Sequence, residues 1–161
     1  MNYSPHLIEA AWATRFKSIL LESTVDFDSS AFVAEKELVE ALGKLSLPVV
    51  CDEDRVLFLQ GQMPSGLFLL REGKATLTME SPTGGVVMSI TAMTGSVLGL
   101  PALIGNEPYT LTAMEYKGAE LGYVSHEDFS SLMLSDPTLA LRVLRVLAAE
   151  VRTARHAISE V

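Results

Sequence analysis

The spacing of hydrophobic residues changes twice along the chain and divides it into three parts. Apolar residues recur at helical intervals before residue 47, in short alternating runs from there to residue 125, and at helical intervals again afterwards. We therefore expect helices over 1–46, a β-structure over 47–125 and helices over 126–161. A chain of 161 residues is long enough to bury one core, so all three parts are expected to form one domain.

Two helices are predicted before the β-structure. Pro5–Glu22 follows a capping serine and carries one apolar stripe, made of Ile8, Trp12, Phe16 and Ile19. This helix is expected to pack on its own domain, with binding of a partner as the alternative. A second helix is predicted over Ala31–Leu45, with four side chains facing inward: Phe32, Leu38, Leu42 and Leu45.

Seven short strands are predicted in the middle of the chain, separated by turns rich in glycine, proline and aspartate. They are Pro48–Cys51, Arg55–Gln60, Gly66–Arg71, Lys74–Glu80, Val86–Thr91, Tyr109–Glu115 and Glu120–Ser125. Helices do not alternate with these strands, as they would in a parallel sheet. The pattern indicates an antiparallel sandwich, barrel or roll.

Two helices are expected after the strands. Ser125 is a candidate cap for a short helix, and Asp136 and Pro137 suit the start of a long one that runs to Val161. The long helix has an unbroken heptad seam, formed by Ala140, Leu144, Leu147, Val151, Ala154, Ile158 and Val161.

The seam predicts a parallel homodimer. Its interface is expected to comprise Leu144, Leu147, Val151, Ala154, Arg155 and Ile158, and Glu150 of one subunit is expected to pair with Arg155 of the other. The alternative is a single amphipathic helix lying along its own β-structure. Leu141 and Val143 widen the apolar stripe at its start, so the first turns are expected to touch the domain itself.

Composition narrows the function. The net charge of −8 opposes contact with phosphates, so direct binding of DNA by this chain is not expected. Cys51 is the sole cysteine and the three histidines are widely spaced, so no metal site is predicted. We find no motif of a catalytic site, which indicates a protein that is not an enzyme. Neither a signal peptide nor a membrane span is apparent, so a cytoplasmic location is expected.

Two segments, Val56–Met79 and Ser96–Leu111, resemble the cyclic-nucleotide-binding domain of the cAMP receptor protein (CRP/FNR) family. Gly61, Gly66 and Gly73 stand where family members have turn glycines, and the resemblance extends from about Ala34 to the end of the chain. It implies a mainly β fold with flanking helices: an antiparallel double-stranded β-helix, or jelly-roll-like β-roll, with N-terminal helices. Family members dimerise through the long C-terminal helix that follows.

The phosphate-binding cassette within Ser96–Leu111 differs from that of the family in its charged residues. The family glutamate that binds the ribose hydroxyl corresponds to Leu100, and the family arginine that pairs with the cyclic phosphate corresponds to Tyr109. Binding of cAMP or cGMP is therefore disfavoured, and no other cofactor is expected. The candidate pocket is apolar and comprises Leu98, Gly99, Leu100, Ala102, Leu103, Tyr109 and Thr110, with Arg155 of the long helix as a substitute cation.

Three functions remain open at this stage. The first is a non-enzymatic, dimeric regulatory or sensor domain whose degenerate pocket binds another small molecule, and we rank it highest. The second is a genuine cAMP- or cGMP-binding signalling domain with unusual contacts, and the third is a dimerisation module without a ligand. Transcription factors of the family continue into a helix-turn-helix domain where this chain ends, so either the domain stands alone or the sequence is a part of a longer one.

Overall fold

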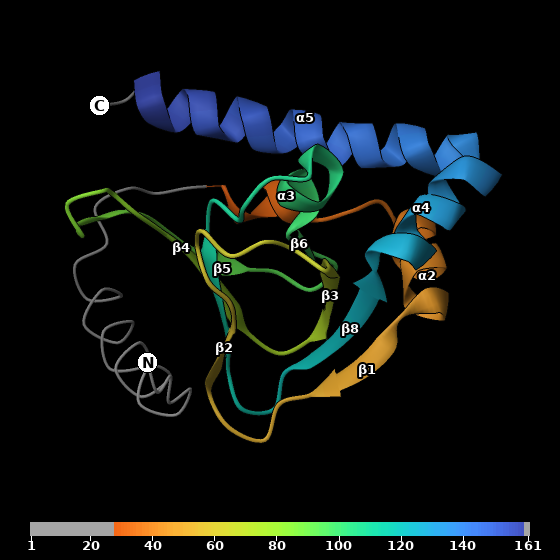
Figure 1. Cartoon of the computed structure of the whole chain (residues 1–161), viewed down its shortest axis with the longest axis horizontal. Helices are drawn as coiled ribbons and strands as arrows, with labels where there is room; N and C mark the ends of the chain where they lie inside the picture. Colours follow the sequence, from red (N-terminus) through yellow and green to blue (C-terminus); the bar gives the residue numbers. More distant parts are fainter. Residues whose placement is uncertain (1–27, 160–161) are drawn as a thin grey trace.

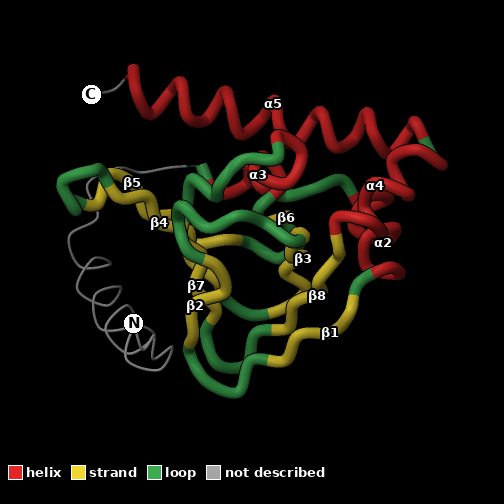
Figure 2. The backbone as a smooth tube through the Cα atoms, viewed as in Figure 1, coloured by secondary structure: helices red, strands yellow, loops and turns green. Residues whose placement is uncertain are grey.

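Two four-stranded antiparallel sheets form the centre of the molecule. The computed structural model describes residues 28–159, so the predicted helix Pro5–Glu22 lies outside the described residues. One sheet has the order β1-β8-β3-β6 and the other the order β2-β7-β4-β5 (Figures 1 and 2). The strands are β1 (Leu47–Val50), β2 (Arg55–Phe58), β3 (Gly66–Glu72), β4 (Ala75–Glu80), β5 (Val86–Ala92), β6 (Val97–Leu98), β7 (Thr112–Glu115) and β8 (Glu120–Ser125).

Strand β3 shows how the sheets divide the core into two clusters. Successive side chains of a strand point to opposite faces, so Phe68 and Leu70 face the interior of the roll. Leu67 and Leu69 face the helices outside it. Both faces of this strand are therefore apolar, whereas an exposed sheet would alternate apolar and polar residues.

Helices cover one side of the roll. The elements are a short 3₁₀ helix, η1 (Ser29–Phe32), followed by α2 (Lys36–Leu45), α3 (Leu100–Gly105), α4 (His126–Ser135) and α5 (Pro137–Ser159). Figure 1 shows α2 and α4 together at one end, with α5 running from them across the roll and over α3. No helix within residues 28–159 is both long enough and apolar enough to cross a membrane.

The prediction of one helix over Ala31–Leu45 was wrong. The chain forms η1, then extends through Val33, which bridges to Ser96, and only then enters α2. The N–H of Ala34 donates to the carbonyl of Gly95 at 3.0 Å, so pairing with a distant segment overrides the helical pattern there. Leu45 was predicted to face inward, but its side chain is 37% exposed.

The predicted caps of the two last helices are confirmed. Ser125 Oγ accepts a hydrogen bond from the N–H of Asp128 at 3.1 Å at the start of α4. Asp136 Oδ1 accepts one from the N–H of Thr138 at 3.1 Å at the start of α5. Each cap satisfies a backbone donor that the first turn of a helix leaves without a partner.

Two kinds of contact attach α5 to its own domain. Val143 and Val146 are 3% and 4% exposed in the core cluster outside the roll. Arg142 pairs with Glu35 and lies 3.3 Å from Glu37, so the loop before α2 and its first turn hold α5 through charge. The first turns of α5 therefore pack on its own domain, as the sequence indicated for Leu141 and Val143, although Leu141 itself is 50% exposed. Ala149 packs on the core cluster inside the roll, so the contact continues along the helix.

The fold class predicted from the sequence is confirmed: a mainly antiparallel β-roll with flanking helices and a long C-terminal helix. Strand β8 has the predicted bounds, but the strand predicted over Tyr109–Glu115 is only β7. Tyr109 exchanges backbone hydrogen bonds with Gly61 and Gln62 in a loop, which keeps it outside the ladder. Strand β6, only two residues long, was not predicted. The boundaries of the three parts stay a prediction.

Candidate functional site

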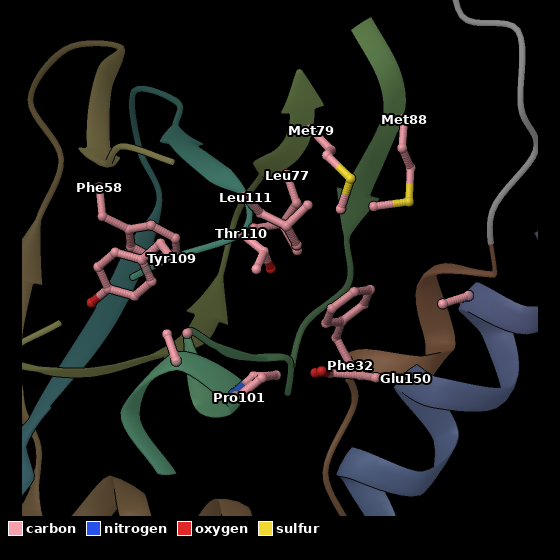
Figure 3. Close-up of a pocket in the computed structure, with 13 residues that line it drawn as sticks. Phe32, Phe58, Leu77, Met79, Met88, Pro101, Tyr109, Thr110, Leu111 and Glu150 are labelled. Carbon is pink, nitrogen blue, oxygen red and sulfur yellow. The ribbon is translucent and has the colours of Figure 1, made fainter. Parts of the chain in front are cut away.

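A cavity of about 140 Å³ lies between the interior of the roll and α5 (Figure 3). Strands β2, β4 and β5 contribute to its walls, together with η1, the start of α3, the loop before β7 and one face of α5. Its lining residues are Phe32, Phe58, Leu77, Met79, Met88, Gly99, Pro101, Ala102, Tyr109, Thr110, Leu111, Glu150 and Ala154. The lining is almost wholly apolar, and its one charged side chain is Glu150.

Tyr109 is fixed in place from several sides. Its ring stacks on that of Phe58 with 3.9 Å between the ring centroids and 15° between the planes. Its hydroxyl donates to the carbonyl of Gly66 at 3.2 Å. Burial, with a smaller contribution from Tyr123, raises the pKa of Tyr109 to about 12. The hydroxyl is thus neutral and already bonded, so it cannot take the place of a positive charge for an anionic ligand.

The turn before α3 allows Tyr109 to lie this close. Gly99 has a φ of 89°, the left-handed region that side chains disfavour. A Cβ built at Gly99 would stand only 2.9 Å from Cε1 of Tyr109, so any larger residue would displace the ring. Glycine is therefore required here both for its backbone conformation and for the close approach of the aromatic ring.

Helix α3 directs its side chains to two different sides. Leu100 and Leu103 lie three residues apart, share one face of the helix, and are 1% and 3% exposed in the cluster outside the roll. Pro101 and Ala102 line the cavity instead. The position that corresponds to the family glutamate is therefore occupied by a core leucine, and no acidic side chain of α3 reaches a ligand in the cavity.

Glu150 introduces a charge from the opposite side. Its carboxyl points from α5 towards the cavity and lies across from Phe58 and Tyr109 (Figure 3). Its Oε1 is buried and has no hydrogen-bond partner among the described residues. Burial raises the pKa of Glu150 to about 8, so a proton is retained near neutral pH.

A second buried carboxyl group shows what Glu150 lacks. Glu115 is fully buried, and Nε of Arg55 donates to its Oε1. This pair stands beside Cys51, and burial, followed by the charge of Glu115, raises the pKa of that thiol to about 11. None of the three lines the cavity. Glu115 thus has a cation beside it, whereas Glu150 has none among the residues that line the cavity.

The structure brings together half of the candidate pocket residues. Gly99, Ala102, Tyr109 and Thr110 line the cavity. Leu98, Leu100 and Leu103 are buried in the core outside its lining, and Arg155 is exposed on α5, also outside the lining. Whether those that line the cavity bind a ligand stays a prediction.

Sequence reasoning did not identify several lining residues, of which Phe32, Phe58, Met79, Met88 and Glu150 are the largest. Glu150 was assigned to a pair with Arg155 of a second subunit, whereas its carboxyl faces the cavity of its own chain. A signal for this was present in the sequence. Val143, Val146, Glu150 and Ala154 follow one another at spacings of three, four and four, which is a second stripe on the same helix.

Comparison with models of protein families shows to which family the chain belongs. The model of the cyclic nucleotide-binding domain matches residues 48–136, more than half of the chain. The chain belongs to the cyclic nucleotide-binding domain family. The match begins in β1 and ends just before α5, so it includes the cassette and the whole roll but not the long helix. A search of curated protein sequences found no match.

Solved structures share this fold at low sequence identity. The Catabolite Activator Protein of Thermus thermophilus is 21% identical with a TM-score of 0.69, over 78% of this chain and 59% of that protein. A protein described with a cyclic-GMP-dependent pathway of bacterial phytopathogenesis is 21% identical with a TM-score of 0.64, over 74% of this chain and 94% of its own. Oxidized CprK, in complex with o-chlorophenolacetic acid, is 14% identical with a TM-score of 0.63, over 80% of this chain and 53% of that protein.

These comparisons establish the fold: a cyclic nucleotide-binding roll followed by a long helix, as in the Catabolite Activator Protein. The chain spans 59% of the length of the Thermus thermophilus protein. Among residues 28–159, no group of three or more histidine, cysteine, aspartate or glutamate side chains is arranged to hold a metal ion.

Proposed function

We propose that this chain is a non-enzymatic, cytoplasmic sensor domain whose cavity binds a small molecule other than a cyclic nucleotide. The observation that carries the proposal is the charge inside the cavity: an unpaired acid, and no arginine, lysine or histidine among the lining residues. A cyclic nucleotide brings a phosphate anion into the site. That anion would have no cation to pair with there and would share the cavity with the carboxyl of Glu150.

The cost of this mismatch is large enough to decide between ligands. A hydrogen bond to a charged group is worth about 1.5–3 kcal/mol, so its loss lowers affinity by roughly tenfold to a hundredfold. The carboxyl of Glu150 adds to this mismatch once it is ionised, above its pKa of about 8, because its negative charge then repels the phosphate. Both effects act against cAMP and cGMP alike.

One structural relative supports a ligand of another kind. The complex of CprK holds o-chlorophenolacetic acid, which is an aromatic acid and not a nucleotide. The roll fold is thus compatible with a small aromatic ligand in at least one protein. The apolar lining of this cavity, with two aromatic rings at one end, suits the ring of such a molecule but not its carboxylate.

Calorimetric titration with cAMP and cGMP tests the proposal. We expect no saturable binding at ligand concentrations up to roughly 100 µM, because the loss of contacts worth several kcal/mol raises the Kd beyond this range. Saturable binding of either nucleotide would instead establish the alternative, a cyclic-nucleotide sensor with unusual contacts. The double variant Tyr109→Arg/Glu150→Gln provides the converse: it adds a cation, removes the acid and is expected to gain affinity for cAMP, provided that its melting curve shows a folded protein.

We also propose that the domain acts as a homodimer through α5. Leu144 and Val151 lie seven residues apart on this helix and are 59% and 50% exposed, so an apolar strip remains available after α5 has packed on its own roll. Leu147, by contrast, packs against the core cluster outside the roll and is only half-buried at the surface. The available strip is therefore centred on the a positions of the heptad.

Sedimentation of the variant Leu144→Asp/Val151→Asp tests the dimer. We expect a monomer, because each buried leucine or valine contributes about 1.5–3 kcal/mol to an interface. Val50→Asp is the matched control: Val50 is 65% exposed in β1, away from α5, so this variant should sediment as the unaltered protein does. If the double variant also sediments like the unaltered protein, α5 does not form the interface.

A further inference from the structure

The cavity has room for about one ring and is partly open to solvent. Its volume of about 140 Å³ is close to that of an engineered apolar cavity of about 150 Å³ that binds benzene. A nucleotide, with base, ribose and phosphate, requires several times this space. Met79 and Met88 lie beside each other on one wall and are half-buried (Figure 3). Their flexible thioethers adapt to the outline of a ring and make favourable contacts with its edge.

The carboxyl of Glu150 is the group in the cavity that lacks a hydrogen-bond partner within residues 28–159. Its Oε1 is buried without a hydrogen bond, and a buried polar atom in that state raises the free energy of the folded protein. The cations of its own helix do not relieve it. Arg142 and Arg145 are bonded to Glu35, and the side chains of Arg152 and Arg155 are exposed.

Within the described part of the chain, no other element that lines the cavity presents a charge to Glu150. Its neighbours in the cavity wall from η1, from the start of α3 and from β4 and β5 are all uncharged. The one other titratable side chain is that of Tyr109, whose hydroxyl donates to Gly66. A ligand that donates a hydrogen bond to the carboxyl would thus be its first partner, and a cationic donor would form the stronger, charge-assisted bond.

We propose that the cavity binds a small aromatic molecule with a basic nitrogen group, with its ring among Leu77, Met79 and Met88 and its nitrogen on the carboxyl of Glu150. This inference rests on the proposed function and names the class of ligand. Shape and charge act together: the apolar walls hold the ring, and the single acid selects a cation over a neutral molecule and a neutral molecule over an anion. The net charge of −8 also favours the approach of a cation.

Three molecules of nearly equal shape test the inference. Benzamidine is a cation, benzamide is neutral and benzoate is an anion, while all three carry the same ring. Each is titrated into the full chain by calorimetry at pH 9, where the carboxyl of Glu150, with a pKa of about 8, is ionised. We expect benzamidine to bind about tenfold or more tightly than benzamide, which is the value of one charge-assisted hydrogen bond, and benzoate to bind more weakly than both.

Two variants assign the preference to Glu150. Glu150→Gln keeps the shape of the side chain and is expected to reduce benzamidine to the affinity of benzamide, with benzamide itself little changed. Glu127→Gln removes the same charge from an exposed position on α4 and should leave the preference intact. Melting curves of both variants establish that they are folded, so a lost preference reports on the site.

The outcomes separate this inference from the proposed function. If benzoate binds best, or if the preference for benzamidine persists in Glu150→Gln, the inference is overturned while a non-nucleotide sensor stands. If none of the three binds, the inference is overturned, and the titration with cAMP and cGMP decides the proposed function independently. Tighter binding of a cyclic nucleotide than of benzamidine overturns both.

Discussion

The buried carboxyl of Glu150 should make the stability of this protein fall as pH rises. Its pKa is about 8 in the folded chain, against an ordinary value of 4.5, and the cause is burial. Between these two values the folded protein holds a proton that the unfolded chain has released. The unfolded chain therefore binds fewer protons in this window, and the free energy of unfolding decreases with rising pH. The decrease begins near pH 4.5 and is complete above pH 8.

The size of the effect follows from the two pKa values. Each pKa unit corresponds to about 1.4 kcal/mol, so the full difference amounts to about 5 kcal/mol. That value is an upper bound, because Glu150 is only half-buried and water that reaches the ionised carboxyl reduces the penalty. We expect a loss of about 2 kcal/mol between pH 5 and pH 8.5 that is due to this one residue.

The variant Glu150→Gln isolates the effect. Urea unfolding of both proteins is measured at several pH values between 5 and 8.5, at one protein concentration, because association would otherwise alter the apparent stability. We expect equal stability within about 0.5 kcal/mol at pH 5 and a variant more stable by about 2 kcal/mol at pH 8.5. The control Glu127→Gln, at an exposed site, should follow the unaltered protein. Parallel curves for Glu150→Gln and the unaltered protein would refute the burial argument.

Two further pairs of variants test the contacts that shape the site. Gly99→Ala should cost about 2–4 kcal/mol, since it combines a positive φ with a Cβ 2.9 Å from the ring of Tyr109, whereas Gly61→Ala, with a φ of 90° and open space around it, should cost about 1 kcal/mol; urea unfolding measures both. Arg142→Ala should cost about 1–2 kcal/mol and Arg145→Ala less than about 1 kcal/mol, because Arg142 is 22% exposed with two acidic partners and Arg145 is 57% exposed with one. Equal losses within either pair would contradict the corresponding contact.

The elements that the sequence predicts well are those with strong local signals. Strand β8 begins after a turn and ends at a capping serine, and its bounds agree with the prediction. Helix α5 begins at Pro137 behind a capping aspartate, as predicted. Where a distant segment decides the conformation, local pattern fails. The bridge between Val33 and Ser96 interrupts the helix predicted over Ala31–Leu45. The residues around Val33 carry no sequence signal that predicts this bridge.

The site was harder to predict than the fold, because it depends on the direction in which each side chain points and not only on its position in the sequence. The cassette could be located from its glycine and small residues, yet a helix turns by about 100° per residue. Leu100 is thereby directed into the core and Pro101 into the cavity, one position apart. Glu150 shows the same limit. A heptad assignment places it beside a partner helix, whereas the seating of Val143 and Val146 on the roll rotates it towards the cavity.

The location of the single charge has a consequence for how the domain would signal. In the proposed complex the polar contact to the ligand comes from α5, the helix proposed to form the dimer, and not from the cassette. Arg142 and Arg145 hold the first half of α5 to the rest of the chain, while Glu150 and the exposed Val151 lie beyond those contacts. A ligand bonded to Glu150 would therefore act on the part of α5 that packs beside η1, beyond these charged contacts. Because Val151 is the next residue, a change in the position of Glu150 moves the proposed dimer strip directly, without any rearrangement of the roll.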